Sequence, residues 1–164
     1  MAAPRYHFVT HWHMPATCEE VYDVLGDPMD LPRWWPDVYL NVREVEPGEP
    51  GGVGRVIELL TKGYLPYRLR WSFRVTETDR PNGFALEAWG DFTGSGRWTF
   101  SPDGDGCAIT YDWNISADKP LLRSLSFVLR PVFSWNHRWA MARGEESLRR
   151  ELARRASVNQ ISPP

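Results

Sequence analysis

Apolar and polar residues alternate along much of the first 115 positions, and a period of two is typical of β-strands with one buried face. The clearest run is 67–78, where aromatic and aliphatic side chains alternate mainly with Arg and Ser. Similar runs predict strands at 6–14, 38–45, 53–61, 84–91, 97–100 and 107–115. Because turns rich in Gly, Pro or Asp separate the runs after residue 38, the pattern indicates an antiparallel meander.

Two short helices are predicted between the first strand and the meander. Residues 17–25 open with Thr17 and carry Glu20 three positions later, which is a capping box at a helix start. At 29–36, prolines bracket one or two helical turns that hold two adjacent tryptophans in a fixed orientation. One tryptophan ring is expected to point inward and the other sideways.

A long helix is predicted near the C-terminus, at 131–155, where apolar residues recur three and four positions apart. Pro131 fits the first helical position, because its missing N–H would be unpaired there in any case. At ~1.5 Å per residue the helix would be roughly 37 Å long, enough to cross a small domain. Its apolar face either packs on a solid core or roofs a cavity.

The order of these elements predicts an α+β helix-grip fold, with strand, two short helices, meander and long helix in sequence. The length favours one domain, assigned to 1–158, with a frayed C-terminal tail at 159–164. Strand parity and the helical stripe place one group of mostly aromatic side chains on the inner face. These are Tyr6, Phe8, Trp12, Leu69, Trp71, Phe73, Leu86, Trp98, Phe100, Tyr111, Trp113 and Met141. A lining of this kind is typical of a small-molecule cavity.

Composition narrows the class of protein. Nine tryptophans in 164 residues indicate a wide apolar interior. A net charge of −2 argues against a dedicated nucleic-acid binder, although the last helix has a local excess of arginines. The first residues contain no apolar leader and no stretch reaches ~18 apolar residues, so we expect a cytoplasmic protein without a membrane span.

The residues that most often bind metals do not assemble into a motif. His7, His11 and His13 share one side of the first predicted strand, but no nearby carboxylate or cysteine accompanies them. We interpret them as polar outer-face residues. Cys18 and Cys107 lack the spacing of a metal site and are interpreted as small buried residues. The sequence therefore predicts neither a metal nor a cofactor.

Four stretches resemble a known family. They are PATCEEVYDVL at 15–25, LPRWWP at 31–36, GVG at 52–54, and WNH at 135–137 followed by Met141, Gly144 and Leu148. Together they resemble the polyketide cyclase/dehydrase branch of the START-like (Bet v 1-like, SRPBCC) superfamily. The resemblance implies a curved sheet of about seven strands around the last helix, with an apolar tunnel between them. It leaves the activity open, because this superfamily includes aromatase/cyclases, lipid and steroid carriers and hormone receptors.

The leading hypothesis is a carrier or sequestering protein for an apolar, aromatic or polycyclic small molecule. The second is a polyketide aromatase/cyclase that uses the same cavity for aldol condensation and dehydration. The third is an interaction or regulatory domain that uses an exposed Trp89 and the basic helix face. The expected partner is an apolar small molecule and not nucleic acid, and the chain is expected to be a monomer or a homodimer.

The predicted ligand-binding residues are Trp35, Leu69, Trp71, Phe73, Leu86, Trp98, Phe100, Tyr111, Trp113, His137 and Met141. Candidate acid/base groups for the enzyme hypothesis are His137, Tyr111 and Glu58, with Glu145 as a further carboxylate.

Two questions of orientation stay open in the sequence. Glu58 and Arg55 lie in a run where both parities are apolar, so either residue could face inward. On the long helix, either His137 or Arg138 could be the polar group that faces the cavity.

Overall fold

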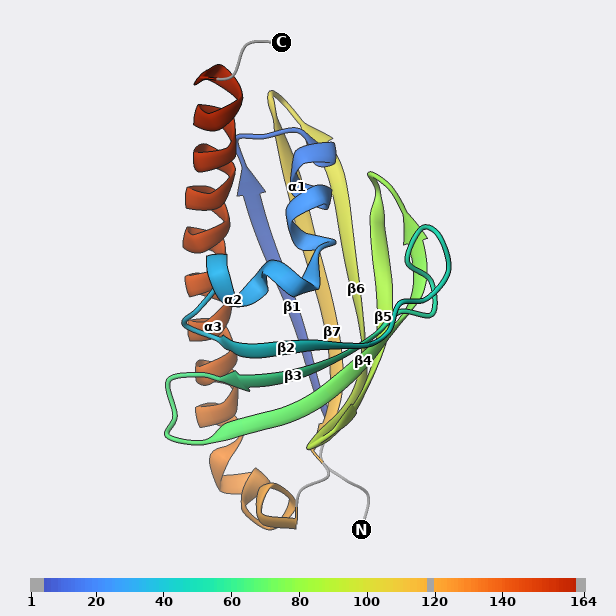
Figure 1. Ribbon diagram of the computed structural model, residues 1–164. Helices are drawn as coiled ribbons and strands as arrows, with labels where there is room; N and C mark the ends of the chain where they lie inside the picture. The colour runs from blue at the N-terminus through green and yellow to red at the C-terminus, as the bar shows by residue number, and fades with distance from the viewer. Residues whose placement is uncertain (1–4, 118–119, 162–164) are drawn as a thin grey trace.

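The computed structural model describes the backbone of residues 5–117 and 120–161, with all their side chains except those of 117–129. Within these residues, seven strands form one antiparallel sheet, and helices precede and follow the meander (Figure 1). The elements are β1 (Arg5–Met14), α1 (Cys18–Leu25), the 3-10 turn η1 (Pro28–Asp30), α2 (Leu31–Trp34), β2 (Tyr39–Glu46), β3 (Val56–Lys62), β4 (Arg68–Asp79), β5 (Gly83–Gly90), β6 (Phe92–Asp103), β7 (Gly106–Ala117) and α3 (Pro120–Ile161). The predicted α+β helix-grip fold is confirmed.

The sheet has the order β1-β7-β6-β5-β4-β3-β2, so β7 returns beside the first strand and closes the meander. Figure 1 shows the sheet curving with its concave side toward α3, while α1 and α2 lie in the space between them. Strand alternation places Trp71 and Phe73 of β4 on this concave face, where both are buried. The predicted inner face is therefore the concave one.

The local signals around α1 are confirmed. Thr17 is the N-cap, and its hydroxyl accepts a hydrogen bond from the Glu20 amide at 3.1 Å. The apolar stripe of α1 packs against the sheet, and Cys18 meets Cys107 of β7 with their sulfur atoms 2.8 Å apart. Both cysteines are buried free thiols, which agrees with their interpretation from the sequence as small buried residues.

Strand β6 is longer than predicted. The sequence limits it to 97–100, but it runs from Phe92 to Asp103 and pairs with β7 along its whole length. Glycines 94 and 96 lie inside it because neighbouring atoms occupy their side-chain positions. A Cβ on Gly96 would lie 2.8 Å from the Trp113 ring. These glycines make room for large rings and do not interrupt the strand.

The long helix also begins earlier than predicted. Helix α3 starts at Pro120, and Pro131 lies inside it. Its first part, orange in Figure 1, is turned away from the long rod, because an internal proline lacks an N–H donor and clashes with the preceding turn. The predicted frayed tail is helical as far as Ile161, and residues 162–164 lie outside the described part of the chain. No helix among the described residues is long and apolar enough to cross a bilayer.

Arginines of α3 cover the outer edge of the sheet. Strand β1 is an edge strand, and its backbone carbonyls on the free side have no strand partner. Arg130 donates to the Arg5 carbonyl at 2.9 Å, and Arg149 donates to the His13 carbonyl at 3.2 Å. Two side chains from one helix thus bind the two ends of the same strand.

Candidate functional site

The described residues line two cavities that could hold a ligand. The first, of about 290 Å³, is bounded by α1, the turn after it and strands β4 to β6, and is called here the α1 cavity. The second, of about 170 Å³, lies between the concave sheet and α3 and is called the α3 cavity. Both are lined mainly by aromatic and aliphatic side chains. Their size and lining suit a small organic molecule.

Four aromatic residues, Trp35, Tyr39, Trp71 and Tyr111, line both cavities and are called the aromatic partition. Trp35 and Tyr39 meet edge to face, with ring centroids 5.0 Å apart. On the opposite wall, the Trp71 indole N–H donates to the Thr61 hydroxyl at 3.0 Å, which fixes its ring. The residues of the partition therefore come from two parts of the fold, the segment after α1 and the sheet.

Trp35 is positioned by a glycine on α3. A Cβ on Gly144 would overlap Cζ2 of the Trp35 ring, so no side chain fits at this position. The indole therefore lies against the helix backbone and is only 2% exposed. This contact explains why a helix interior carries glycine despite its low helix propensity.

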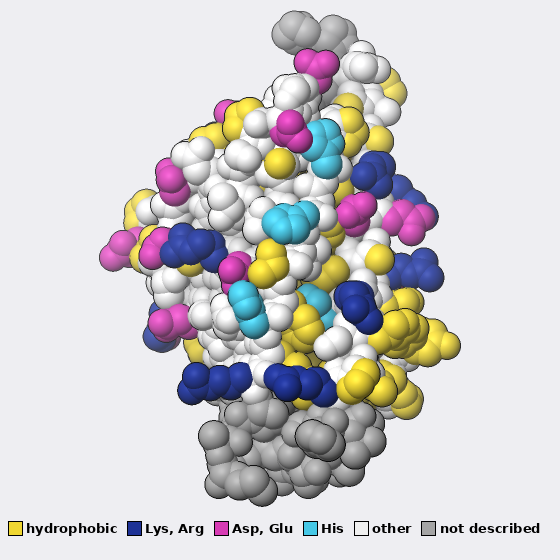
Figure 2. Space-filling view, turned by 180° about the vertical axis from the view of Figure 1, so that it is seen from behind, with side chains coloured by type: hydrophobic (Ala, Val, Ile, Leu, Met, Phe, Trp, Pro, Cys, Tyr) yellow, Lys and Arg dark blue, Asp and Glu magenta, His cyan; other side chains and the backbone are white. Residues whose placement is uncertain are grey.

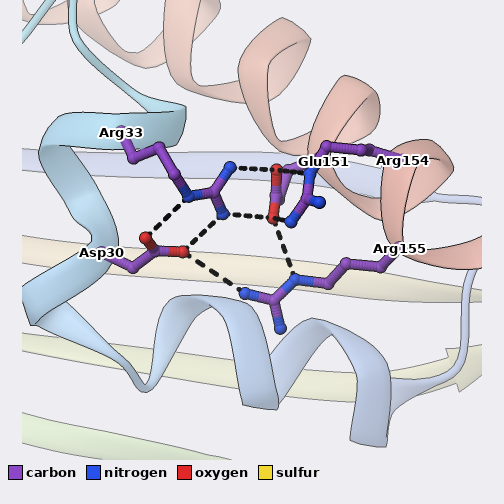
Figure 3. Close-up of polar contacts among 5 residues, drawn as sticks. All are labelled: Asp30, Arg33, Glu151, Arg154 and Arg155. Atoms are coloured by element: carbon purple, nitrogen blue, oxygen red, sulfur yellow. Dashed lines mark hydrogen bonds and ion pairs between the residues drawn. The ribbon is translucent and has the colours of Figure 1, made fainter. Parts of the chain in front are cut away.

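A cluster of ion pairs also joins α2 to α3 (Figure 3). Arg33 of α2 donates to both carboxylate oxygens of Glu151 on α3, at 3.1 and 2.5 Å, and also binds Asp30. Arg154 and Arg155 donate to the same Glu151 carboxylate at 2.8 and 2.9 Å. α2 is thereby fixed to the long helix.

The carboxylate of Glu151 is the buried centre of this cluster, with a side chain 3% exposed. Burial alone would raise its pKa, but hydrogen bonds from Arg154, Arg33 and Arg155 outweigh burial and hold the pKa well below its usual range. Glu151 is therefore ionised at all physiological pH values. The sequence did not indicate this cluster, because its residues are 118 positions apart between Arg33 and Glu151.

His137 lines the α3 cavity beside Asn136 of the same helix, whereas Arg138 is exposed. Its imidazole stacks on Phe8 with centroids 4.1 Å apart. Burial lowers its pKa from 6.5 to about 4, so the ring is neutral near pH 7. A neutral imidazole supplies one donor and one acceptor nitrogen but no charge.

Three residues of the α3 cavity carry a buried polar atom without a hydrogen-bond partner among the described residues. These atoms are the Tyr6 hydroxyl, the Trp35 indole nitrogen and Nε2 of His137. Leaving such a group unpaired costs about 1–3 kcal/mol, so unpaired groups usually have a missing partner such as a ligand or water.

Tyr111 and Tyr39 contribute hydroxyl groups at the partition. Burial raises the pKa of Tyr111 well above 10, and the neighbouring Tyr39 adds to the shift. Burial likewise raises the pKa of Tyr39. Both phenols therefore stay protonated and can act as hydrogen-bond donors, but not as bases, near neutral pH.

Ten of the eleven predicted ligand-binding residues line these cavities. Phe73, Leu86 and Trp98 line the α1 cavity; Leu69, Trp113, His137 and Met141 line the α3 cavity; Trp35, Trp71 and Tyr111 line both. The remaining residue, Phe100, lines neither, and packs between Tyr22, Phe84 and Trp98 beneath α1.

The charged candidates lie away from the cavity walls, except for one. Glu58 is on the outer side of β3, where it pairs with Arg43 at 3.2 Å. Glu145 lies at the edge of α3 and pairs with Arg149 at 3.8 Å. Arg55 is different, because it lines the α1 cavity while it binds Glu44 at 2.6 Å. Of the proposed acid/base groups, only His137 and Tyr111 border the cavities.

Sequence reasoning missed several residues of the walls, including Tyr39 and Asn136. Tyr39 was inside a predicted strand, but β2 has an irregular register next to it, so strand parity did not indicate its direction. Asn136 was quoted only for its resemblance, yet its side chain accepts from the amides of Tyr64 and Leu65 at 2.7 and 3.2 Å. This side chain ties the loop between β3 and β4 to α3, beside the α3 cavity.

The three histidines of β1 lie on the outer face of the sheet, which Figure 2 shows. Their side chains bind Asp112, Thr110 and the Asp103 carbonyl. Among the described residues, no group of three His, Cys, Asp or Glu side chains is placed to hold a metal ion.

Comparison with known proteins agrees with this architecture. Residues 5–153 match the family described as "Polyketide cyclase / dehydrase and lipid transport". The chain belongs to this family. Its membership supports a ligand-binding or a polyketide-cyclase role. No curated protein matches the sequence.

Solved structures share the fold at low sequence identity. TTHA0849 from Thermus thermophilus is 20% identical, with a TM-score of 0.70 over 87% of this chain and 97% of that one. A START superfamily protein from Mycobacterium smegmatis is 13% identical, with a TM-score of 0.69 over 90% and 97%. The Zhui aromatase/cyclase from Streptomyces sp. R1128 is 17% identical, with a TM-score of 0.65 over 93% and 96%. At such identities the likeness shows the fold alone.

Proposed function

We propose that this protein binds a neutral, largely apolar small molecule, aromatic or polycyclic, in the space between the sheet and α3, and acts as its carrier or sequestering protein. This proposal rests on the unpaired polar atoms of Tyr6, Trp35 and His137 at the wall of a mainly apolar cavity. An apolar wall with a few convergent polar groups is the usual form of a small-molecule site.

The chemistry of these groups defines the ligand class further. The Trp35 indole can only donate a hydrogen bond, so the ligand atom that faces it is an acceptor such as a carbonyl or ether oxygen. Because His137 is neutral near pH 7 and Lys62 is exposed to solvent, the described walls of the α3 cavity offer no buried cation to pair with an anionic ligand. A neutral aromatic compound with oxygen acceptors satisfies both conditions.

Binding is favoured over catalysis by the protonation states of the walls. His137 has a pKa of about 4, and Tyr111 stays protonated, so neither is tuned near pH 7 as a general base. Glu58 lies outside both cavities. The described residues of the cavity walls are therefore better suited to bind a ligand through hydrogen bonds and complementary shape than to transfer protons.

The binding test uses a neutral fluorescent aromatic, N-phenyl-1-naphthylamine, together with native mass spectrometry of the purified protein. Ala140 lines the α3 cavity, and Ala142 is an exposed residue of the same helix. We expect Ala140→Leu to weaken probe binding at least tenfold and Ala142→Leu to leave it unchanged. Absence of probe binding by the wild-type protein, or equal effects of the two variants, would refute the proposed site.

A second candidate function is an aromatase/cyclase, favoured by the presence of Tyr111 and His137 at one cavity. There, a protonated tyrosine and a neutral histidine could bind the carbonyl oxygens of a poly-ketone during aldol condensation. The test is cyclisation of a poly-ketone by wild-type protein, Tyr111→Phe and His137→Gln. Catalysis predicts loss of turnover with retained binding, whereas a pure carrier shows no turnover in any of them.

A further inference from the structure

An aromatic patch lies beside the α3 cavity and is defined here by the exposed Tyr64, Val132 and Trp135 together with the half-buried Trp139. Tyr64 is 64% exposed and Trp135 is 43% exposed. Their rings meet edge to face at 4.8 Å, and Tyr64 also contacts Trp139 at 5.9 Å. Because large aromatic side chains are seldom exposed together on a monomer, such a patch indicates contact with another surface.

The charges around the aromatic patch are mainly positive, although Arg70 pairs with Glu58 at 3.9 Å and Arg143 pairs with Glu146 at 4.0 Å. The two described segments that form it, 59–76 and 130–144, contain Lys62, Arg68, Arg70, Arg74, Arg130, Arg138 and Arg143 but no Asp or Glu. Figure 2 shows hydrophobic side chains gathered at the lower right edge with Lys and Arg side chains beside them, while the acidic side chains lie elsewhere. The surface that this patch fits is therefore apolar at its centre and negatively charged around it.

The local contacts hold these side chains in place. Arg143 lies over the Trp139 ring at 5.4 Å, and Asn136 fixes the backbone of Tyr64 to the helix. A Cβ on Gly63 would overlap the Asn136 side chain, so glycine is required for this closure. The patch is thus a built feature of α3 and the β3–β4 loop.

We propose that the aromatic patch docks on an anionic lipid membrane. Tyr and Trp prefer the membrane–water interface because an apolar ring and a polar tip suit its two sides. Flanking Lys and Arg add attraction to anionic headgroups. Lys62, Asn136 and Phe133 line the α3 cavity and adjoin the patch, so docking brings this cavity to the bilayer.

The membrane inference extends the proposed function, since an apolar ligand dissolves in a bilayer and can be exchanged there. It does not depend on the ligand's identity. Docking and ligand binding are also separable, because Trp135 and Arg138 line neither cavity.

The test is co-sedimentation of the full chain with vesicles of phosphatidylcholine alone or mixed with an equal amount of phosphatidylglycerol. We expect binding to the mixed vesicles that weakens with salt, and little binding to the neutral ones. Arg138→Gln should weaken binding to the mixed vesicles about fivefold, because it removes one cation from an anionic surface. Trp135→Ser should weaken it by at least as much.

Matched controls come from the same chain. Arg150→Gln alters an exposed arginine of the same helix that is paired with Glu146, and Trp89→Ser removes an exposed tryptophan from the sheet. Both should bind vesicles like wild type, and Trp135→Ser should still bind N-phenyl-1-naphthylamine in solution. The proposal is overturned if mixed vesicles are not bound, if the controls lose binding equally, or if poly-glutamate is bound while vesicles are not.

Discussion

The indole ring of Trp35 rests on the backbone of α3 at Gly144, where its Cζ2 atom fills the place that a Cβ would take. This contact joins the segment after α1 to the long helix at the aromatic partition. The width of both cavities therefore depends on a residue that has no side chain.

Gly144→Ala is expected to destabilise the protein by about 1–3 kcal/mol, because Trp35 must move from a well-packed position. Helix propensity alone would give the opposite sign, a gain of up to ~1 kcal/mol. Urea denaturation measures the difference. In a Trp35→Leu background the penalty should disappear, and a stabilising effect of Gly144→Ala in the wild-type background would contradict this account.

His137 predicts an acid-dependent loss of stability. Its pKa is about 4 in the folded protein and 6.5 in the unfolded chain, so the unfolded state binds more protons between these values. The contribution of His137 to the free energy of unfolding is fully present above pH 6.5. It falls by roughly 3 kcal/mol in total as the pH drops toward 4. The free energy of unfolding, measured by urea denaturation at several pH values in this range, should depend less steeply on pH in His137→Gln than in the wild-type protein. An unchanged slope would show that the imidazole is not desolvated.

Glu151→Gln should cost about 2–4 kcal/mol of stability, because three arginines lose their shared carboxylate. The estimate lies toward the low end for a buried pair because Arg33 and Arg154 are 45% and 53% exposed. Glu146→Gln is the matched control, since Glu146 pairs with Arg150 at the surface of the same helix. It should change stability by less than ~0.5 kcal/mol. Similar losses for both variants would assign Glu151 no special role.

Asn136→Ala should release the loop between β3 and β4. The change removes the acceptor of the Tyr64 and Leu65 amides, which predicts a loss of about 1–2 kcal/mol and faster hydrogen exchange at these two amides. Ser134→Ala, two residues earlier on the helix, should leave this exchange unchanged. Protection that survives in Asn136→Ala would mean that another group holds the loop.

The two cysteines should be unreactive in the native protein. Burial and the hydrogen bond with Cys18 raise the pKa of Cys107 to about 12, so almost no thiolate is present at pH 8. Iodoacetamide labelling followed by mass spectrometry should modify the thiols only after unfolding. Rapid labelling of the native protein at Cys107 would contradict this expectation.

The sheet could be predicted because its signals are local. In β4, burial of alternate residues sets the inner face, and Trp71 and Phe73 lie where parity places them. The start of α1 could likewise be predicted, because Thr17 and Glu20 make their capping contact within one turn. Such patterns depend on neighbours in sequence, which the chain displays directly.

The errors arise where tertiary contacts override a local rule. Pro131 reads as a helix start, yet α3 continues through it with a bend. The predicted strand at 97–100 leaves out Gly94 and Gly96, yet β6 includes both glycines, which make room for Trp113 and its neighbours. The pairing of Arg33 with Glu151 depends on the fold alone, and no spacing in the sequence marks it.

The facing of Glu58 shows the same limit within one strand. Both parities of β3 are apolar, so burial could not be assigned by alternation. The structure places Ile57 and Leu59 in the core, and Glu58 therefore points outward to Arg43. The candidate site is correspondingly better predicted for its aromatic residues than for its charged ones.

The hydrogen bonds from Arg130 and Arg149 to strand β1 have a consequence for assembly. A second chain that extended the sheet at this edge would need the same carbonyls of Arg5 and His13, and would first have to remove two guanidinium groups. Repulsion between the displaced cations and their counterparts on the incoming copy would add to that cost. The helix that roofs the cavity thus also protects the sheet against edge-to-edge polymerisation.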